Sequence, residues 1–201
     1  MKRIFASTFF VLTLAALLSA CAIPYETPEA RANIERDLKL NSDDIVSISQ
    51  INWCLFPYGD LNVCQPRNGL GVVTKTNLVL AYFKGGMYES AVVINTSDIQ
   101  CAHMQNGRTE AGDFYVFTEP YAALLRLVPI TGALALEKKD QFLSVLAPPS
   151  TETFTGVQGN FIQDTGHKNY SALAVPGGSY VGTSESIMQI INPCTKGKTA
   201  P

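Results

Sequence analysis

The sequence predicts an α+β fold that is mainly antiparallel: a bent sheet or small barrel closed by a helix, with a disulfide-tied C-terminal extension. Short apolar runs follow one another from about residue 44 to residue 128, separated by Gly, Asn, Asp and Pro. These connections are too short for the crossover helices that parallel strands need. Two further segments, one before and one after these runs, have apolar residues at helical spacing, which predicts flanking helices.

The N-terminal segment has the order of a secretory signal peptide: a basic start, an uncharged apolar run over residues 4–18, and small residues at its end. The motif Leu18-Ser19-Ala20-Cys21 resembles the lipobox of bacterial lipoproteins. This resemblance implies cleavage after Ala20 and lipidation of Cys21. Two or three acyl chains anchor a protein stably, because each buried methylene contributes about 0.8 kcal/mol. An ordinary signal peptide and an uncleaved anchor are the alternatives.

The same resemblance implies a cellular location for the protein and a division of the chain into segments. Ala22, not Asp, follows the cysteine, which in enterobacterial lipoproteins implies sorting to the outer membrane. Retention at the inner membrane is the alternative, and the periplasmic and outer faces both stay open. We expect a lipoprotein signal peptide over residues 1–20, a tether over 21–28, an N-terminal helix and mainly β domain over 29–147, and an extension packed on that domain over 148–201.

The composition and charge of the chain argue against two classes of function. The chain has 201 residues, with 15 Lys and Arg against 17 Asp and Glu and a formal charge of −2. Nucleic-acid binding is disfavoured, because neutralising phosphates needs a surplus of basic residues. A multi-pass membrane protein is excluded, because only one long apolar run is present. Cleavage after residue 20 removes Lys2 and Arg3 and leaves 181 residues with a charge of −4.

The first helix is expected to begin after Thr27, the N-cap, with Pro28 in the first helical position. Ala30, Ile34 and Leu38 then follow near helical spacing, and the helix should end by residue 41. The apolar runs that come next are the expected strands: residues 45–51, 70–73, 78–83, 88–95, 114–118 and 122–128.

A closing helix is expected over residues 134–146, ending before two prolines that disfavour helix in the preceding residue. Phe142, Val145 and Leu146 would share its apolar side, and the charged residues over 138–140 would lie elsewhere. The proline pair marks the boundary of the extension.

Inside the extension, short strands are expected near residues 154–162. A helix is expected over 184–191, where three isoleucines recur at helical spacing. The Gly177-Gly178 pair is interpreted as a hairpin turn.

Part of the strand region resembles a GRAM domain. Residues 71–80 contain a Gly-initiated strand and a Thr-x-x-Asn turn that leads into another apolar strand. Residues 94–99 and 114–118 resemble the segments that follow in this family. The resemblance covers about residues 44–147 and implies the pleckstrin-homology superfold, a bent antiparallel sheet capped by a C-terminal helix. Three cysteines depart from the family pattern, and no Lys and Arg cluster points to a phosphoinositide site, so no lipid-binding role is carried over.

Four cysteines besides Cys21 remain, an even number in an oxidising compartment, which favours two disulfides. Cys54 with Cys64 is the local pairing, because a turn at Gly59-Asp60 would bring the two together. Cys101 with Cys194 would then tie the C-terminal segment to the middle of the chain. Two other pairings are open. A zinc site and an oxidoreductase are disfavoured, because no Cys-x-x-Cys pair occurs.

The search for catalytic motifs finds none: no nucleophile elbow, no His-Glu-x-x-His and no phosphate-binding loop. His103 and His167 lie among polar turn residues, which favours solvated loop histidines over a general base or a metal ligand. No catalytic residue, metal or cofactor is therefore assigned.

The aromatic residues Trp53, Phe56 and Tyr58 lie close to the first cysteine pair and are candidates for binding a partner, because rigid aromatics are favoured at interfaces. The alternative is that they pack into the core beside a disulfide. The preferred function is a non-enzymatic, lipid-anchored envelope protein that binds or scaffolds an envelope partner. The alternative is a periplasm-facing hydrolase or lipid-handling protein with an unrecognised site.

Overall fold

The computed structural model describes residues 23–60, 64–105, 112–128, 133–155 and 161–194. Within them, eight strands form one large sheet in the order β5-β4-β3-β1-β8-β7-β6-β9. Their bounds are β1 Ile45–Pro57, β3 Arg67–Thr74, β4 Asn77–Lys84, β5 Met87–Asn95, β6 Cys101–Met104, β7 Phe114–Phe117, β8 Tyr121–Val128 and β9 Glu152–Thr155.

The long strand β1 joins the two halves of this sheet. Its residues 45–53 pair with β3, and its residues 50–57 pair with β8. β1, β3, β4 and β5 form one antiparallel meander, β6, β7 and β8 form a second, and helix α3 (Ala133–Leu146) follows. This order confirms the expected bent antiparallel sheet with a closing helix, the pleckstrin-homology-like arrangement. β9 is the exception, because it pairs in parallel with β6.

Helix α2 (Pro28–Leu38) has the predicted start. The Thr27 Oγ1 accepts a hydrogen bond from the Ala30 N–H at 3.1 Å. Pro28 has no N–H that would need a hydrogen-bond acceptor in the first turn. The helix ends where Lys39 adopts a left-handed conformation, with φ of 56°. Two 3₁₀ turns, Ser42–Asp44 and Thr96–Asp98, flank the first meander. In the described part of the chain, no helix has the length and apolar character needed to span a bilayer.

The chain before α2 lies against the domain. Ile23 and Tyr25 pack against the buried cluster that contains Ile34 and Tyr88. The Tyr88 hydroxyl donates a hydrogen bond to the Pro24 carbonyl. The tether expected over residues 21–28 is therefore in contact with the domain from Ile23 onward.

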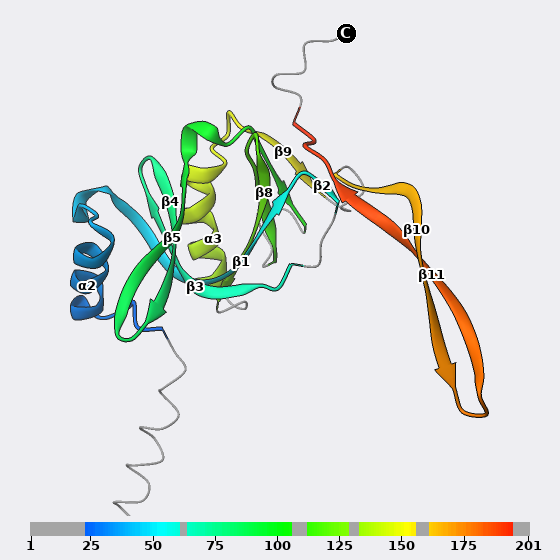
Figure 1. The fold of residues 1–201 in the computed structure, drawn as a ribbon. Coiled ribbons are helices and arrows are strands. Elements are labelled where there is room, and N and C mark those ends of the chain that lie inside the picture. Colours follow the sequence, from blue (N-terminus) through cyan, green and yellow to red (C-terminus); the bar gives the residue numbers. More distant parts are fainter. Residues whose placement is uncertain (1–22, 61–63, 106–111, 129–132, 156–160, 195–201) are drawn as a thin grey trace, which may run out of the picture.

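Helix α3 covers one face of the sheet, as Figure 1 shows, and buries Phe142, Leu143 and Leu146 there. The prediction for Lys139 is wrong, because this side chain is only 2% exposed. Residue 139 precedes Phe142 by three positions and Leu143 by four, so helical geometry puts all three on the same side.

The C-terminal extension forms a hairpin of β10 (Ile162–Val175) and β11 (Ser179–Ile190), which pairs at its base with β2 (Gly59–Asp60). The hairpin projects from the body, as Figure 1 shows, so only its base packs on the domain. The predicted turn is confirmed, with φ of +105° at Gly177 and +79° at Gly178.

The helix predicted over residues 184–191 is wrong. Gln189 and Ile190 pair with β10 on one side and with β2 on the other. Isoleucine suits a strand as well as a helix, and here pairing with neighbouring strands decides the conformation.

Both expected disulfides are present. Cys54 is bonded to Cys64, ten residues away, with a Cα–Cα distance of 5.9 Å. Cys101 is bonded to Cys194, 93 residues away, with a Cα–Cα distance of 5.6 Å. The second bond ties the end of the extension to β6.

Candidate functional site

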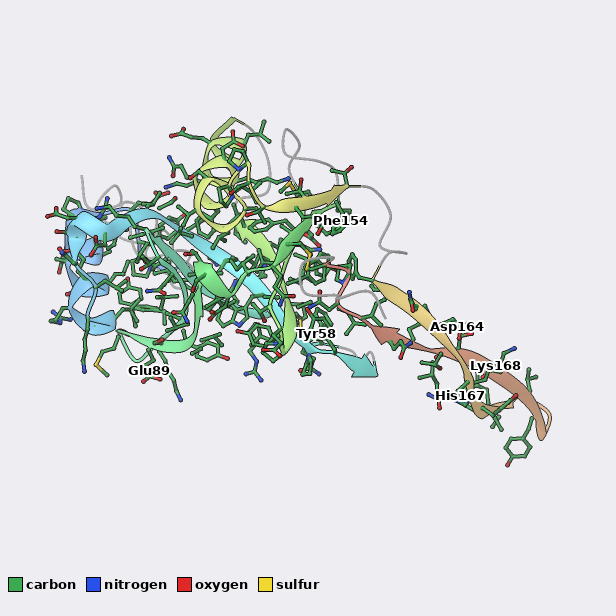
Figure 2. All side chains as sticks on the ribbon, turned by 90° about the horizontal axis from the view of Figure 1, so that it is seen from above. Tyr58, Glu89, Phe154, Asp164, His167 and Lys168 are labelled. Carbon is green, nitrogen blue, oxygen red and sulfur yellow. A yellow bond between two sulfur atoms is a disulfide. The ribbon has the colours of Figure 1, made fainter. Side chains whose placement is uncertain are left out.

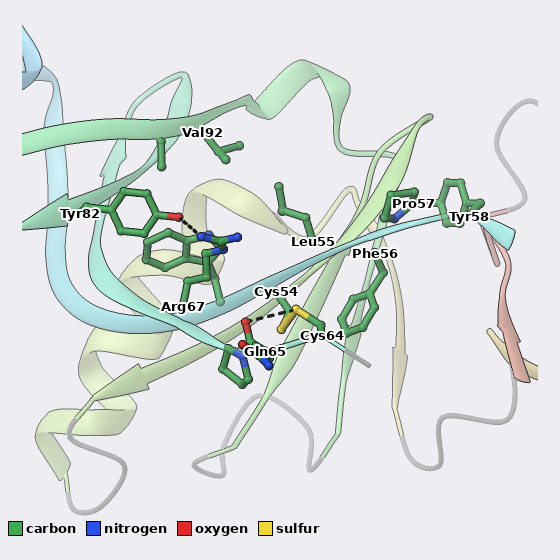
Figure 3. Close-up of a pocket in the computed structure, with 13 residues that line it drawn as sticks. Cys54, Leu55, Phe56, Pro57, Tyr58, Cys64, Gln65, Arg67, Tyr82 and Val92 are labelled. Carbon is green, nitrogen blue, oxygen red and sulfur yellow. Dashed lines mark hydrogen bonds between the residues drawn. A yellow bond between two sulfur atoms is a disulfide. The ribbon is translucent and has the colours of Figure 1, made fainter. Parts of the chain in front are cut away.

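A groove of about 1060 Å³ opens beside the first disulfide (Figure 3). It lies where β1 continues beyond Trp53, the last residue that pairs with β3. Across the groove, the register between β4 and β5 shifts and leaves Ala91 without a partner in the ladder. The lining side chains are mostly aromatic or apolar, with Gln65 and Arg67 as the polar exceptions.

Trp53 lines the bottom of this groove rather than its rim. Its side chain is 2% exposed and packs across β3 at Gly69. A Cβ on Gly69 would lie 2.5 Å from the Trp53 Cζ3 and 2.2 Å from the Ala81 carbonyl oxygen, so this position requires glycine. Trp53 therefore belongs to the core beside the disulfide, the alternative that the sequence left open.

Arg67 and Tyr82 form the polar edge of the groove. The Arg67 Nη1 donates a hydrogen bond to the Tyr82 hydroxyl at 3.0 Å, and Figure 3 shows this contact. The ring centroids of Tyr82 and Trp53 are 5.3 Å apart and their planes are tilted by 36°. This edge presents a cation beside aromatic surface, which suits an acidic or aromatic side chain of a partner.

The Cys54–Cys64 disulfide holds segment 64–66 beside β1 and so forms the other edge of the groove. The turn predicted at Gly59-Asp60 is wrong. Gly59 has φ of +115° and pairs with Ile190, so this dipeptide is the short strand β2. The sequence suggested that the chain reverses direction at Gly59-Asp60. In the structure the dipeptide is extended instead, because it pairs with β11 of the C-terminal extension.

Phe56 and Tyr58 continue the lining at the far end of the groove and are half-buried. Both pack against the cluster formed by Cys101, Phe117, Phe161 and their neighbours. The Tyr58 hydroxyl donates to the Thr118 carbonyl oxygen at 2.7 Å, and burial raises the pKa of Tyr58. The structure thus brings all three candidate aromatics to one groove, and their role in partner binding stays a prediction.

The two histidines lie apart from the groove. His103 belongs to β6, a strand the sequence did not predict, and it is fully buried, so its interpretation as a solvated loop residue is wrong. Its ring lies 4.9 Å from that of Phe161 and 6.0 Å from that of Tyr115. His167 is exposed on β10. Among the described residues, no group of three or more His, Cys, Asp or Glu side chains could hold a metal ion.

We expect the buried and half-buried tyrosines to make the fold sensitive to alkali. Burial is the main cause that raises the pKa of five tyrosines, and it raises that of Tyr115 from 10.0 to about 12. Above pH 10 the unfolded chain loses these protons while the folded chain keeps them. Stability is therefore complete below pH 10 and falls as the pH rises toward 12.

We expect tyrosinate absorbance and loss of circular dichroism to develop together in an alkaline titration. Tyr115→Phe should move the midpoint to higher pH, because it removes one hydroxyl whose ionisation opposes folding. Complete tyrosine ionisation with the circular dichroism unchanged would contradict this prediction.

The hairpin tip is a second exposed surface, and the sequence analysis missed it. Tyr170 is 81% exposed, Tyr180 75%, Leu173 59% and Val181 50%. The sequence does contain a signal for this surface. Residues 169–184 include no Asp, Glu, Lys or Arg, although they lie outside the expected signal peptide and outside the core.

Comparison with known proteins gives weak structural likenesses only. No family model matches the sequence, and no curated protein matches it. A solved structure of Vav1 inhibited by an allosteric inhibitor has a TM-score of 0.40 and 9% identity, over 77% of this chain and 42% of the Vav1 chain. A structure on the role of the PH and C1 domains of the Vav1 exchange factor has a TM-score of 0.40 and 9% identity, over 76% and 42%. Autoinhibited Vav1 has a TM-score of 0.34 and 11% identity, over 68% and 24%. This chain thus spans less than half the length of these Vav1 chains.

Proposed function

We propose that this protein is a non-enzymatic, lipid-anchored protein of the bacterial cell envelope, attached to the outer membrane, that binds an envelope protein in the groove beside Cys54–Cys64. The groove is the observation that carries the proposal. Its aromatic and apolar lining, edged by one arginine, has the composition of a protein-binding surface.

The architecture of the groove supports binding of a protein segment. A disulfide fixes one edge, and Trp53 fixes the bottom by packing on Gly69, so little conformational entropy is lost when a partner binds. Arg67 and Tyr82 offer a charged and a neutral polar contact at the opening. Neither His103 nor His167 lines the groove, so no histidine is available there to act as a general base.

At the level of family, we propose a GRAM-like domain over about residues 44–147. The segment over 71–80 that carries the resemblance covers the end of β3, the turn at Lys75-Thr76 and the start of β4. The segment over 114–118 corresponds to β7. No phosphoinositide role is included in this proposal.

The lipid anchor depends on Cys21, which lies outside the described residues. We expect Cys21→Ser to abolish attachment of the acyl chains, because the thiol that carries them is gone. Metabolic labelling with palmitate should mark the parent chain but not the variant. Palmitate labelling of the variant would contradict lipidation at Cys21.

Partner binding in the groove can be tested by site-specific photo-crosslinking in cells. A photo-reactive amino acid at Gln65, which lines the groove and is exposed, should give one discrete adduct with an envelope protein. The same amino acid at Thr76, exposed at the other end of β3, is the matched control and should give none. Equal adducts from both positions, or none from Gln65, would contradict binding in the groove.

A further inference from the structure

The tip of the β10–β11 hairpin has the chemistry of a surface that meets lipid headgroups. It contains no charged residue over 169–184, and two tyrosines are its most exposed large side chains. Tyr170 and Tyr180 lie on the same face of the hairpin, separated by Ala172 and Gly182, which are paired with each other. Tyrosine is favoured at membrane interfaces, because its ring is apolar and its hydroxyl can stay hydrated.

Charged residues begin where this uncharged tip ends. Figure 2 shows Asp164 and Lys168 between the tip and the body, and Glu185 lies opposite Asn169 on β11. Such a boundary would limit how deeply the hairpin enters a bilayer, because charged groups stay in water. The tip is also too short to cross the bilayer. Its strand contributes residues 169–175, whereas a transmembrane strand needs about 9–11 residues.

The start of the described chain fixes where a membrane would lie. Ile23 and Tyr25 are packed on the domain, and Pro24 is bonded to Tyr88. If Cys21 carries the lipid, two residue steps separate it from Ile23, a distance of at most about 7 Å. The domain would therefore rest at the bilayer surface. In Figure 1 the chain enters the domain at its lower side, and the hairpin tip points to that same side.

We propose that the hairpin tip is a second membrane contact, which lies in the headgroup layer of the bilayer that holds the lipid anchor. The orientation in this proposal rests on the proposed lipidation of Cys21. The exposed backbone edges of the hairpin can stay hydrated in this layer, which they could not in the hydrocarbon core. A second copy of the chain is a poorer occupant, because a stable protein interface uses about 20–30 residues on each side and the tip offers four large apolar side chains.

The test uses the mature chain from residue 21 with Cys21→Ser, so that binding depends neither on acyl chains nor on the apolar run over residues 4–18. The protein is mixed with vesicles of phosphatidylethanolamine and phosphatidylglycerol, and the bound fraction is measured by flotation. We expect measurable partitioning that changes little with salt, because the tip carries no charge. Tyr170→Ser with Tyr180→Ser should lower the partition coefficient on the order of tenfold or more. Val93→Ser is the matched control, since Val93 is 52% exposed on β5, and it should bind like the parent.

Each alternative outcome is distinct. Absence of vesicle binding by the Cys21→Ser chain, or binding that the paired serine substitutions leave unchanged, would overturn the proposal. Oligomers that form without vesicles and disappear in the paired variant would assign the tip to a second copy and overturn the membrane contact. Failure of the lipid anchor would appear separately, as absence of palmitate on the parent chain in cells. Thermal unfolding followed by circular dichroism confirms that each variant is folded.

Discussion

Replacing Cys101 and Cys194 together by alanine should lower the free energy of unfolding by roughly 4–5 kcal/mol. The bond closes a loop of 93 residues, so its removal greatly increases the conformational freedom of the unfolded chain. Both cysteines are buried, at 0% and 2% exposure, and they belong to the cluster that joins the extension to the sheet. Exchanging both avoids leaving a free thiol. Urea unfolding followed by circular dichroism measures the loss.

The first disulfide provides the matched control. Cys54→Ala with Cys64→Ala opens a loop closed over ten residues, so the expected loss is about 3 kcal/mol. The order of the two losses is the prediction, since both pairs remove the same kind of bond. A smaller loss for the long-range pair would contradict the view that this bond stabilises the whole fold. It would indicate that the extension adds little to the stability of the sheet.

The strands of the large sheet could be predicted because their signal is local. In β3, β4 and β5 the apolar runs lie between Gly, Asn and Asp residues that mark turns, and each strand pairs with the next along the chain. The short strand β6 has no such signal. It pairs with β7, the next strand, on one side and with β9 on the other, and the His103 ring also contacts Phe161. β9 and Phe161 lie far along the chain, so the burial of His103 depends on contacts that the local sequence does not reveal.

The candidate site was predictable in part for a similar reason. The cysteine count and spacing point to the Cys54–Cys64 bond, and the neighbouring aromatics do line a groove. The sequence left open whether Trp53 is exposed or buried, because its burial depends on a contact with Gly69 on the neighbouring strand β3. Two errors were avoidable. Helical spacing alone puts Lys139 with Phe142, and the absence of charge over residues 169–184 marks the hairpin tip.

Replacing Phe161 by alanine should cost about 3–5 kcal/mol of unfolding free energy, because it leaves a cavity in the cluster at the base of the extension. Phe161 is fully buried, and its ring lies 4.8 Å from that of Tyr115 and 5.1 Å from that of Phe117. Its carbonyl also accepts a hydrogen bond from the Ile191 N–H at 2.9 Å. This residue thus holds the hairpin base against β7, and the same urea unfolding experiment measures its loss.

The combination with the disulfide variant shows how the extension is held. Phe161 and the Cys101–Cys194 bond stabilise the same cluster, so the loss in the triple variant should be smaller than the sum of the separate losses. Once one attachment is gone, the extension separates more readily and the other attachment stabilises less. Tyr170→Ala, at an 81% exposed position of the hairpin, is the control and should change stability by no more than about 0.5 kcal/mol. Fully additive losses would mean that the two attachments act independently, and that the base of the hairpin is not one cooperative unit with the sheet.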